Sequence, residues 1–196
     1  ESIGWLHGET GGRALYWRLS PRDNLRFYAY LQNVPSDVAV RRIEALIDFF
    51  DLRSVRDTMV KDLSTGMKMK VMLARTLLPN PPVLLMDEPT VGLDAPSAME
   101  VRSLLTALSR DLGKTMLFTT HNLFEAERLC ERVAIINGGR IIALDTPLGL
   151  SRVARELRAI ELKVSGSLGE KGLSLLERMA KKGAVKVEAG EDYTLV

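Results

Sequence analysis

The apolar positions along the chain change their spacing several times, and each spacing predicts a different element. Two short apolar runs, 83–86 and 115–118, are continuous, as is typical of strands in a parallel sheet that is covered on both faces. The segments after Ser36, Gly66 and Asp94 instead place apolar residues three or four positions apart, as amphipathic helices do. The sequence therefore predicts an α/β fold with a parallel sheet at its core.

Hydroxyl side chains indicate where some of these helices begin. Ser36 and Ser64 each stand before a helical pattern and are natural N-caps, and the segment 19–25 opens an earlier helical region. The helix after Asp94 is predicted to bury one apolar face, made of Val101, Leu104, Leu105, Leu108 and Leu112.

The pattern after the second apolar run indicates antiparallel structure. Two apolar segments, 133–136 and 140–143, flank Asn137-Gly138-Gly139, which predicts a hairpin. From about Ser151 the pattern changes again. Strands at 160–164, 185–187 and 193–196 and a helix at 173–179 predict a small β-α-β-β unit.

Two adjacent carboxylates, Asp87 and Glu88, end the first apolar run. Ligands of parallel sheets bind beyond the carboxyl ends of the strands, and successive strand residues point to opposite faces. We therefore expect the two acids to do different work: one can hold a magnesium ion while the other prepares a water for attack on a phosphate. The alternative is a strand that ends in a solvated acidic turn.

Two other segments have residues suited to phosphate chemistry. Ser64 and Gly66 stand at a predicted helix start, where free N–H groups attract anions and a glycine permits close approach. His121 follows the second predicted strand, at the edge where Asp87 and Glu88 lie. The alternatives are an ordinary capped helix and a structural histidine.

Taken in order, these segments resemble the ATP-binding subunit of ABC transporters. Residues 63–67 are similar to the signature motif of that family, 83–88 to its Walker B strand, 92–94 to its D-loop, and His121 to its switch histidine. The resemblance extends to about Leu150. Segments 122–130 and 139–141 resemble the subgroup that exports drugs, polysaccharides or ions.

The resemblance implies a P-loop NTPase fold of ABC type with three parts. Residues 1–79 would form the Q-loop segment and an α-helical subdomain, and 80–150 the nucleotide-binding core. Residues 151–196 would form the small C-terminal unit, which resembles the C-terminal extension of exporter-type subunits.

The sequence has no Gly-x-x-x-x-Gly-Lys-[Ser/Thr] segment, the Walker A loop that cradles the phosphates of ATP. The family places this loop before the segments seen here, and the chain begins at Glu1 rather than at Met. We therefore expect this chain to be the C-terminal part of a longer subunit and to be inactive by itself. The competing interpretation is a relative that naturally lacks the loop and has a regulatory role.

The resemblance also implies roles for individual residues, with ATP and Mg²⁺ as cofactors. Asp87 would hold magnesium, Glu88 would activate the attacking water, and His121 would stabilise charge on the γ-phosphate. Ser64, Thr65 and Gly66 would contact ATP held by a second copy of the subunit in a homodimer, with Asp94 linking the two sites. Thr65 and Met67 depart from the usual signature sequence.

At the Q-loop position the family has glutamine, and this chain has Glu9. Glu9 is a tentative second magnesium ligand, although it adds a negative charge near two other carboxylates. A transmembrane permease subunit is the partner that the resemblance implies. The aromatic-rich stretch near the Q-loop that we expect to dock it consists of Arg13, Leu15, Tyr16, Trp17 and Leu19; the alternative is packing within the subdomain.

The resemblance implies a peripheral location on the cytoplasmic face of the membrane, and the composition fits a soluble ATPase. The chain has 196 residues and a formal net charge of +2, so no nucleic-acid footprint is expected. No apolar run approaches the ~20 residues that span a bilayer, and the single cysteine, Cys130, excludes a disulfide framework. A non-transport ATPase of ABC type remains the other alternative.

Overall fold

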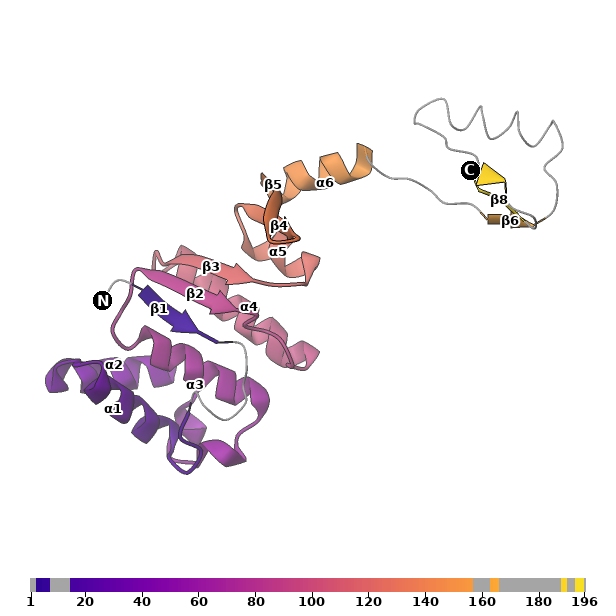
Figure 1. The fold of residues 1–196 in the computed structure, drawn as a ribbon. Coiled ribbons are helices and arrows are strands. Elements are labelled where there is room, and N and C mark those ends of the chain that lie inside the picture. Colours follow the sequence, from indigo (N-terminus) through magenta and orange to yellow (C-terminus); the bar gives the residue numbers. More distant parts are fainter. Residues whose placement is uncertain (1–2, 8–14, 157–162, 166–187, 190–192, 196) are drawn as a thin grey trace. The chain divides into compact units, whose positions relative to one another are not determined.

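The computed structural model describes residues 3–7, 15–156, 163–165, 188–189 and 193–195 (Figure 1). The chain divides into two compact units, Glu1–Val133 and Ala134–Val196, which we describe one at a time. The sequence predicted divisions after residues 79 and 150, and the boundary between the two units coincides with neither of them. The three functional parts remain a prediction.

A three-stranded sheet forms the centre of the first unit. Its strands are β1 (Ile3–Leu6), β2 (Val83–Asp87) and β3 (Thr115–Thr119), in the order β1-β2-β3. Both pairings are parallel, and the three arrows of Figure 1 point the same way. The predicted parallel α/β core is therefore confirmed.

Only one face of this sheet is covered by the residues that the structure describes. Leu84 and Met86 on β2 are buried, whereas Leu85 between them is half-buried. The neighbours of Leu85 in register are Trp5 on β1 and Leu117 on β3, which are 59% and 68% exposed. The expectation of a strand covered on both faces is therefore wrong for this part of the chain, because the described helices pack against one face alone.

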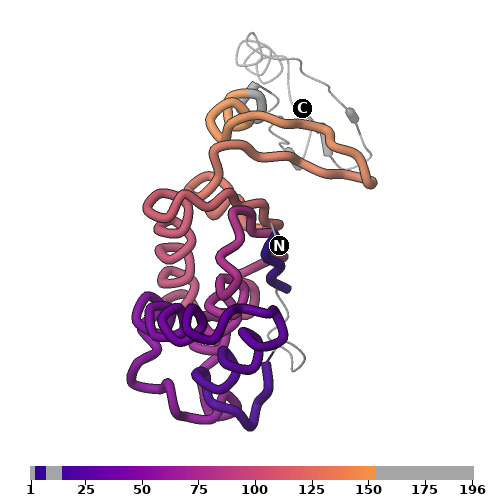
Figure 2. Tube along the Cα trace, turned by 90° about the vertical axis from the view of Figure 1, so that its left-hand side faces the viewer, coloured from indigo at the N-terminus to yellow at the C-terminus, as the bar shows by residue number. Residues whose placement is uncertain are grey.

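The described residues of the first unit form five helices. They are α1 (Pro21–Leu31), α2 (Ser36–Phe49), α3 (Thr65–Leu77), α4 (Ala95–Arg110) and α5 (Leu123–Leu129), with short 3₁₀ turns η1 (Arg53–Val55) and η2 (Val60–Asp62). In Figures 1 and 2, α1 and α2 lie together at one end of this unit. Leu25, Ile47 and Met72 from α1, α2 and α3 join Leu84 in one buried core. The first three are completely or almost completely inaccessible to solvent, so the helices and the sheet form a single body.

Of the two predicted N-caps, Ser64 is confirmed and Ser36 is not. The side chains of Ser20, Ser64 and Asp94 each accept a hydrogen bond from a backbone N–H in the first turn of α1, α3 and α4. Ser36 was predicted to be an N-cap, but it is the first residue of α2, and Pro35 occupies the capping position without a side-chain bond.

The apolar face predicted for α4 is largely confirmed. Val101, Leu105 and Leu108 are buried, and Leu104 packs against the core. Leu112 lies beyond the end of the helix and is 53% exposed, because α4 ends at Arg110 before the turn that contains Gly113.

The second unit contains the predicted hairpin, whose first strand starts at the unit boundary. Strands β4 (Val133–Asn137) and β5 (Arg140–Asp145) pair across Gly138 and Gly139, whose φ angles of 55° and 73° suit the tight turn. Helix α6 (Pro147–Glu156) follows. Farther along, β6 (Lys163–Ser165), β8 (Tyr193–Leu195) and β7 (Glu188–Ala189) form an antiparallel sheet in that order. The predicted helix at 173–179 and strand at 185–187 lie outside the described residues.

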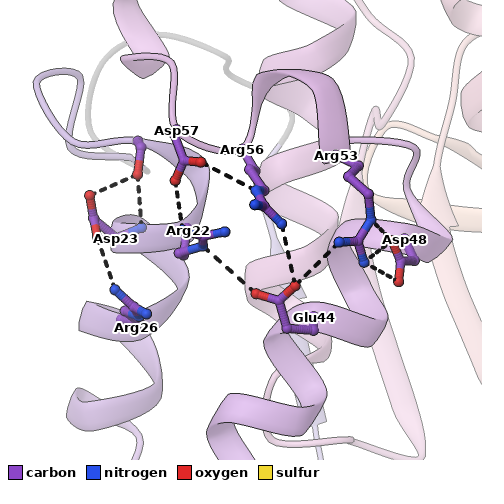
Figure 3. Close-up of polar contacts among 9 residues, drawn as sticks. Arg22, Asp23, Arg26, Glu44, Asp48, Arg53, Arg56 and Asp57 are labelled. Atoms are coloured by element: carbon purple, nitrogen blue, oxygen red, sulfur yellow. Dashed lines mark hydrogen bonds and ion pairs between the residues drawn. The ribbon is translucent and has the colours of Figure 1, made fainter.

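A network of ion pairs joins α1, α2 and the segment around η1 (Figure 3). Arg22 on α1 lies 2.9 Å from Asp57 and 3.7 Å from Glu44 on α2. Glu44 also faces Arg53 and Arg56, at 3.6 and 3.8 Å. The side chain of Arg22 is only 21% exposed, so its charge depends on these partners more than a surface charge would.

We expect Arg22→Met to destabilise the protein by about 1–2 kcal/mol, because Glu44 and Asp57 would lose their most buried cation. Arg26→Met is the matched control: Arg26 lies one turn farther along α1, is 63% exposed and pairs only with Asp23 in this network, at 3.6 Å. Its loss should cost less than about 0.5 kcal/mol. Urea denaturation measures both, and equal costs would contradict a special role for Arg22.

Candidate functional site

The carboxyl ends of the three parallel strands bring together residues that are far apart in the sequence. Asp87 ends β2 and lies opposite Thr119, which ends β3. The Thr119 hydroxyl donates a 2.5 Å hydrogen bond to one carboxylate oxygen of Asp87. His7, which follows β1, places its Nδ1 3.9 Å from the other oxygen. Sequence reasoning missed Thr119 and His7, although the parallel register would have placed them here once the strands were aligned.

Glu88 points to different partners from Asp87, as the alternation of strand residues predicted. Its carboxylate lies 3.0 Å from Nδ1 of His121, and its backbone N–H donates to Thr119, with the carbonyl oxygen at 3.2 Å and the hydroxyl at 3.1 Å. Its φ of 44° lies in the left-handed region, which a residue with a side chain rarely adopts. The backbone at Glu88 is therefore held in a sparsely populated conformation by its contacts with β3.

The contact between Glu88 and His121 changes how the histidine binds protons. The hydrogen bond that the His121 ring donates to the Glu88 carboxylate, reinforced by the negative charge of Glu88, raises the pKa of His121 above its ordinary value. His121 is protonated at pH values below its ordinary pKa, and the attraction to Glu88 is lost as pH rises through the raised pKa of His121. Both side chains are accessible, at 75% exposure for His121 and 37% for Glu88, so the pair lies where a ligand can reach it.

We expect Glu88→Gln to lower the pKa of His121 towards its ordinary value, because the substitution removes the negative charge that favours the imidazolium. NMR titration of the ring protons measures this. The sequence has two histidines, so the His7→Gln variant assigns the signals. An unchanged pKa of His121 would show that the pair does not form in solution.

The signature segment 63–67 lies at the start of α3. The hydroxyl of Ser64 accepts a hydrogen bond from the N–H of Met67, at 3.2 Å, and Thr65 is the first helical residue. Gly66 is buried against the start of α4: a Cβ at this position would lie 2.6 Å from Oγ and 2.8 Å from Cβ of Ser97. Gly66 is therefore required by the contact between two helix starts, which the sequence pattern did not reveal.

Asp94 holds Ser97 in place at this contact. Its two carboxylate oxygens accept hydrogen bonds from the N–H and the hydroxyl of Ser97, at 2.8 and 3.1 Å. The bond from the backbone N–H, followed by that from the hydroxyl, keeps the pKa of Asp94 below its ordinary value. Within the chain Asp94 thus acts as the N-cap of α4, and its role between two subunits remains a prediction.

We expect Gly66→Ala to destabilise the protein by about 1–3 kcal/mol, because the new methyl group would overlap Ser97. Ser97→Gly removes both close atoms and leaves the nearest remaining atom, Cα, at 3.8 Å. The double variant should therefore be more stable than the sum of the single effects predicts, by about 1–2 kcal/mol. Denaturant unfolding of all four proteins provides the measurement, and strict additivity would argue against the clash.

Of the residues expected at the Q-loop and the permease surface, the structure describes only some. Glu9 and Arg13 lie outside the described residues. Leu15 is buried, whereas Tyr16 and Trp17 are 49% and 50% exposed. Tyr16 also packs edge-on against Phe27 of α1, with ring centroids 4.7 Å apart. The aromatic stretch thus takes part in packing within the subdomain and also presents accessible surface.

The chemistry around Asp87 fits a magnesium ion that is bound jointly with phosphate. Mg²⁺ usually takes one or two protein carboxylates, substrate phosphates and water, rather than a closed protein cage. Asp87 is 54% exposed, and its Oδ2 faces His7 only at 3.9 Å. Among the described residues, no group of three or more acids, histidines or cysteines is positioned to hold a metal alone.

Comparison with known proteins agrees with this geometry. Residues 3–91 match the family described as ABC transporter. The solved structure of cbiO1 from Clostridium perfringens, described as part of the ABC transporter complex cbiONQ, superposes with a TM-score of 0.69 at 28% identity. The match covers 80% of this chain and 62% of that one. The chain is therefore similar to the ATP-binding proteins of ABC transporters. Its α/β fold is the fold of ABC ATPases.

Curated members of the family include proteins of both transport directions. The Nod factor export ATP-binding protein I of Neorhizobium galegae is 40% identical over 129 residues, which are 66% of this chain and 37% of that protein. The sn-glycerol-3-phosphate import ATP-binding protein UgpC of Ruegeria pomeroyi is 31% identical over 177 residues, 90% of this chain and 49% of that protein. The chain thus spans half or less of the length of these relatives. No helix within the described residues has both the length and the apolarity to cross a membrane.

Proposed function

We propose that this chain supplies the hydrolytic carboxylate, the switch histidine and the signature motif of an ATPase that powers transport through a membrane permease. The observation that carries the proposal is the pair of Glu88 and His121, 3.0 Å apart at the edge of the sheet where Asp87 also lies. A general base, a cationic hydrogen-bond donor and a metal ligand at one sheet edge are what phosphate hydrolysis requires.

Glu88 would orient the attacking water and accept its proton. Its carboxylate is 37% exposed and is fixed from the main chain by two contacts with Thr119, so it can face a ligand without losing its position. With Nδ1 of His121 turned towards Glu88, the protonated ring has Nε2–H left to donate to an oxygen of the γ-phosphate. The raised pKa of His121 favours this protonated form.

Asp87 would hold Mg²⁺ together with the phosphates of ATP, and Glu9 is the tentative second carboxylate. The ion would supply positive charge against the phosphate oxygens. The bond from Thr119 orients one oxygen of Asp87, and the other oxygen remains accessible.

Ser64, Thr65 and Gly66 would bind the phosphate of ATP held by a second copy of the protein. The start of α3 supports this assignment because backbone N–H groups of a first helical turn attract anions. Each copy would then complete the site of the other, as in a symmetric homodimer, and Asp94 at the adjoining start of α4 would lie close to the junction.

Transport by a permease partner at the cytoplasmic face of the membrane is proposed from the relatives. Export is the favoured direction, because the Nod factor export protein is 40% identical to this chain and the importer 31%. The half-exposed rings of Tyr16 and Trp17 support a docking surface for the permease on the α-helical subdomain.

In the protein as its gene encodes it, Glu88→Gln should lower the turnover of ATP by about a hundred- to ten-thousand-fold, as expected for loss of a general base. ATP binding should persist, because the substitution leaves the other proposed contacts in place. Phosphate release and calorimetric ATP titration measure the two effects. Glu127→Gln on the exposed side of α5 removes the same charge and should leave turnover unchanged. Near-normal hydrolysis by the Glu88 variant would remove it from the catalytic role.

A further inference from the structure

A buried glutamate that the catalytic scheme does not use lies behind the candidate site. Glu125 is the third residue of α5 and is 2% exposed. One of its carboxylate oxygens accepts hydrogen bonds from the Thr90 hydroxyl, at 2.6 Å, and from Nε of Arg102, at 3.2 Å. The other accepts from the Thr120 hydroxyl, at 2.9 Å. Both oxygens of a desolvated carboxylate are therefore engaged.

The partners of Glu125 come from the two segments that carry the catalytic pair. Thr90 stands two residues after Glu88, in the turn beyond β2, and Thr120 stands directly before His121, in the loop beyond β3. Thr120 is also tied to the start of α5, since its hydroxyl accepts from the N–H of Asn122 at 3.0 Å. A single side chain thus joins the turn that contains the general base to the loop that contains the switch histidine.

Arg102 and the burial of Glu125 hold this hydrogen-bond network in one arrangement. Arg102 extends from α4, is 19% exposed and lies with its guanidinium 5.7 Å from the centre of the Phe124 ring. A buried carboxylate that lost one of its donors would pay a desolvation cost, so its partners are held in one arrangement. The contact between the side chains of Glu88 and His121 supplies no comparable restraint by itself, because accessible ion pairs contribute little energy.

We propose that Glu125 is a positioning residue, which holds Thr90 and Thr120 on its two oxygens and thereby fixes Glu88 and His121 at hydrogen-bond distance. It does so from within the protein, through the two threonines. The expected effect of Glu125 on turnover rests on the proposed ATPase function. Its effect on the contact between Glu88 and His121 can be tested without ATP.

The competing explanation is that Glu125 and Arg102 stabilise the fold and act on His121 only through charge. A thermodynamic cycle separates the two. The pKa of His121 is measured by NMR in the starting protein and in Glu88→Gln, and the lowering caused by this substitution reports the contact between the two residues. The same lowering is then measured in a Glu125→Gln background. If Glu125 acts only through its charge, Glu125→Gln changes the pKa of His121 equally with and without Glu88→Gln, and the lowering caused by Glu88→Gln stays the same. If Glu125 positions the pair, the lowering caused by Glu88→Gln becomes smaller in the Glu125→Gln background.

Thr90→Val provides an uncharged version of the test, with Thr90→Ser as its matched control. Valine has nearly the shape of threonine but cannot donate to Glu125, while serine keeps the hydroxyl. We expect the effect of Glu88→Gln on His121 to be reduced in the valine background and retained in the serine background. This arm decides the question if Glu125→Gln does not fold. Equal effects of Glu88→Gln in every folded background would overturn the proposal.

Turnover provides the second measurement, in the protein as its gene encodes it. We expect Thr90→Val to reduce kcat about ten- to hundred-fold with little change in KM for ATP, since misplacement of catalytic groups affects the chemical step. Thr90→Ser should restore most of the rate. If the starting protein shows no ATPase activity, the proposed function fails, and the NMR cycle still decides the role of Glu125. If activity is present but Thr90→Val keeps a normal kcat, the positioning role fails alone.

Discussion

Parallel pairing of β2 with β3 is the constraint on which the candidate site depends. Because the two strands run the same way and Asp87 lies opposite Thr119, the residues that follow each strand emerge at one edge of the sheet. Thr119 binds both acidic residues. Its hydroxyl donates a hydrogen bond to the Asp87 carboxylate, and its hydroxyl and carbonyl oxygens both accept from the backbone N–H of Glu88. A shift of one residue in this register would turn every side chain of β2 to the opposite face and separate these groups.

A second constraint connects the signature segment to the turn that follows the acids. Helices α3 and α4 begin side by side, and only a glycine at position 66 leaves room for Ser97. Asp94 fixes Ser97 through two hydrogen bonds within the first turn of α4, so the side chain against which Gly66 packs is itself held in place. The signature segment 63–67 thus packs against the first turn of α4, which directly follows the segment 92–94 that resembles the D-loop.

The sequence predicted the elements whose signals are local, and it failed where the determining contact is long-range. Continuous apolar runs identified β2 and β3, and the hydroxyl of Ser64 identified the start of α3, because strand pattern and capping act over a few residues. Ser36 was misplaced by one position, since the proline before it takes the capping place. Coverage of both sheet faces was also expected, whereas the described helices pack on one face, because a run of apolar residues does not determine which elements pack on it. The burial of Glu125 was invisible, since its partners lie 35, 23 and 5 positions away.

The candidate site combines exposed groups, to which we assign the chemistry, with buried groups that hold them. The pair of Glu88 and His121 must be accessible to a ligand, and an accessible ion pair is weakened by water and screened by salt. Its geometry therefore has to come from elsewhere: from the main-chain contacts of Glu88 with β3 and from the carboxylate of Glu125 behind both segments. The strained φ of Glu88 agrees with this division, because a conformation that the residue would not adopt alone persists only where neighbouring contacts impose it.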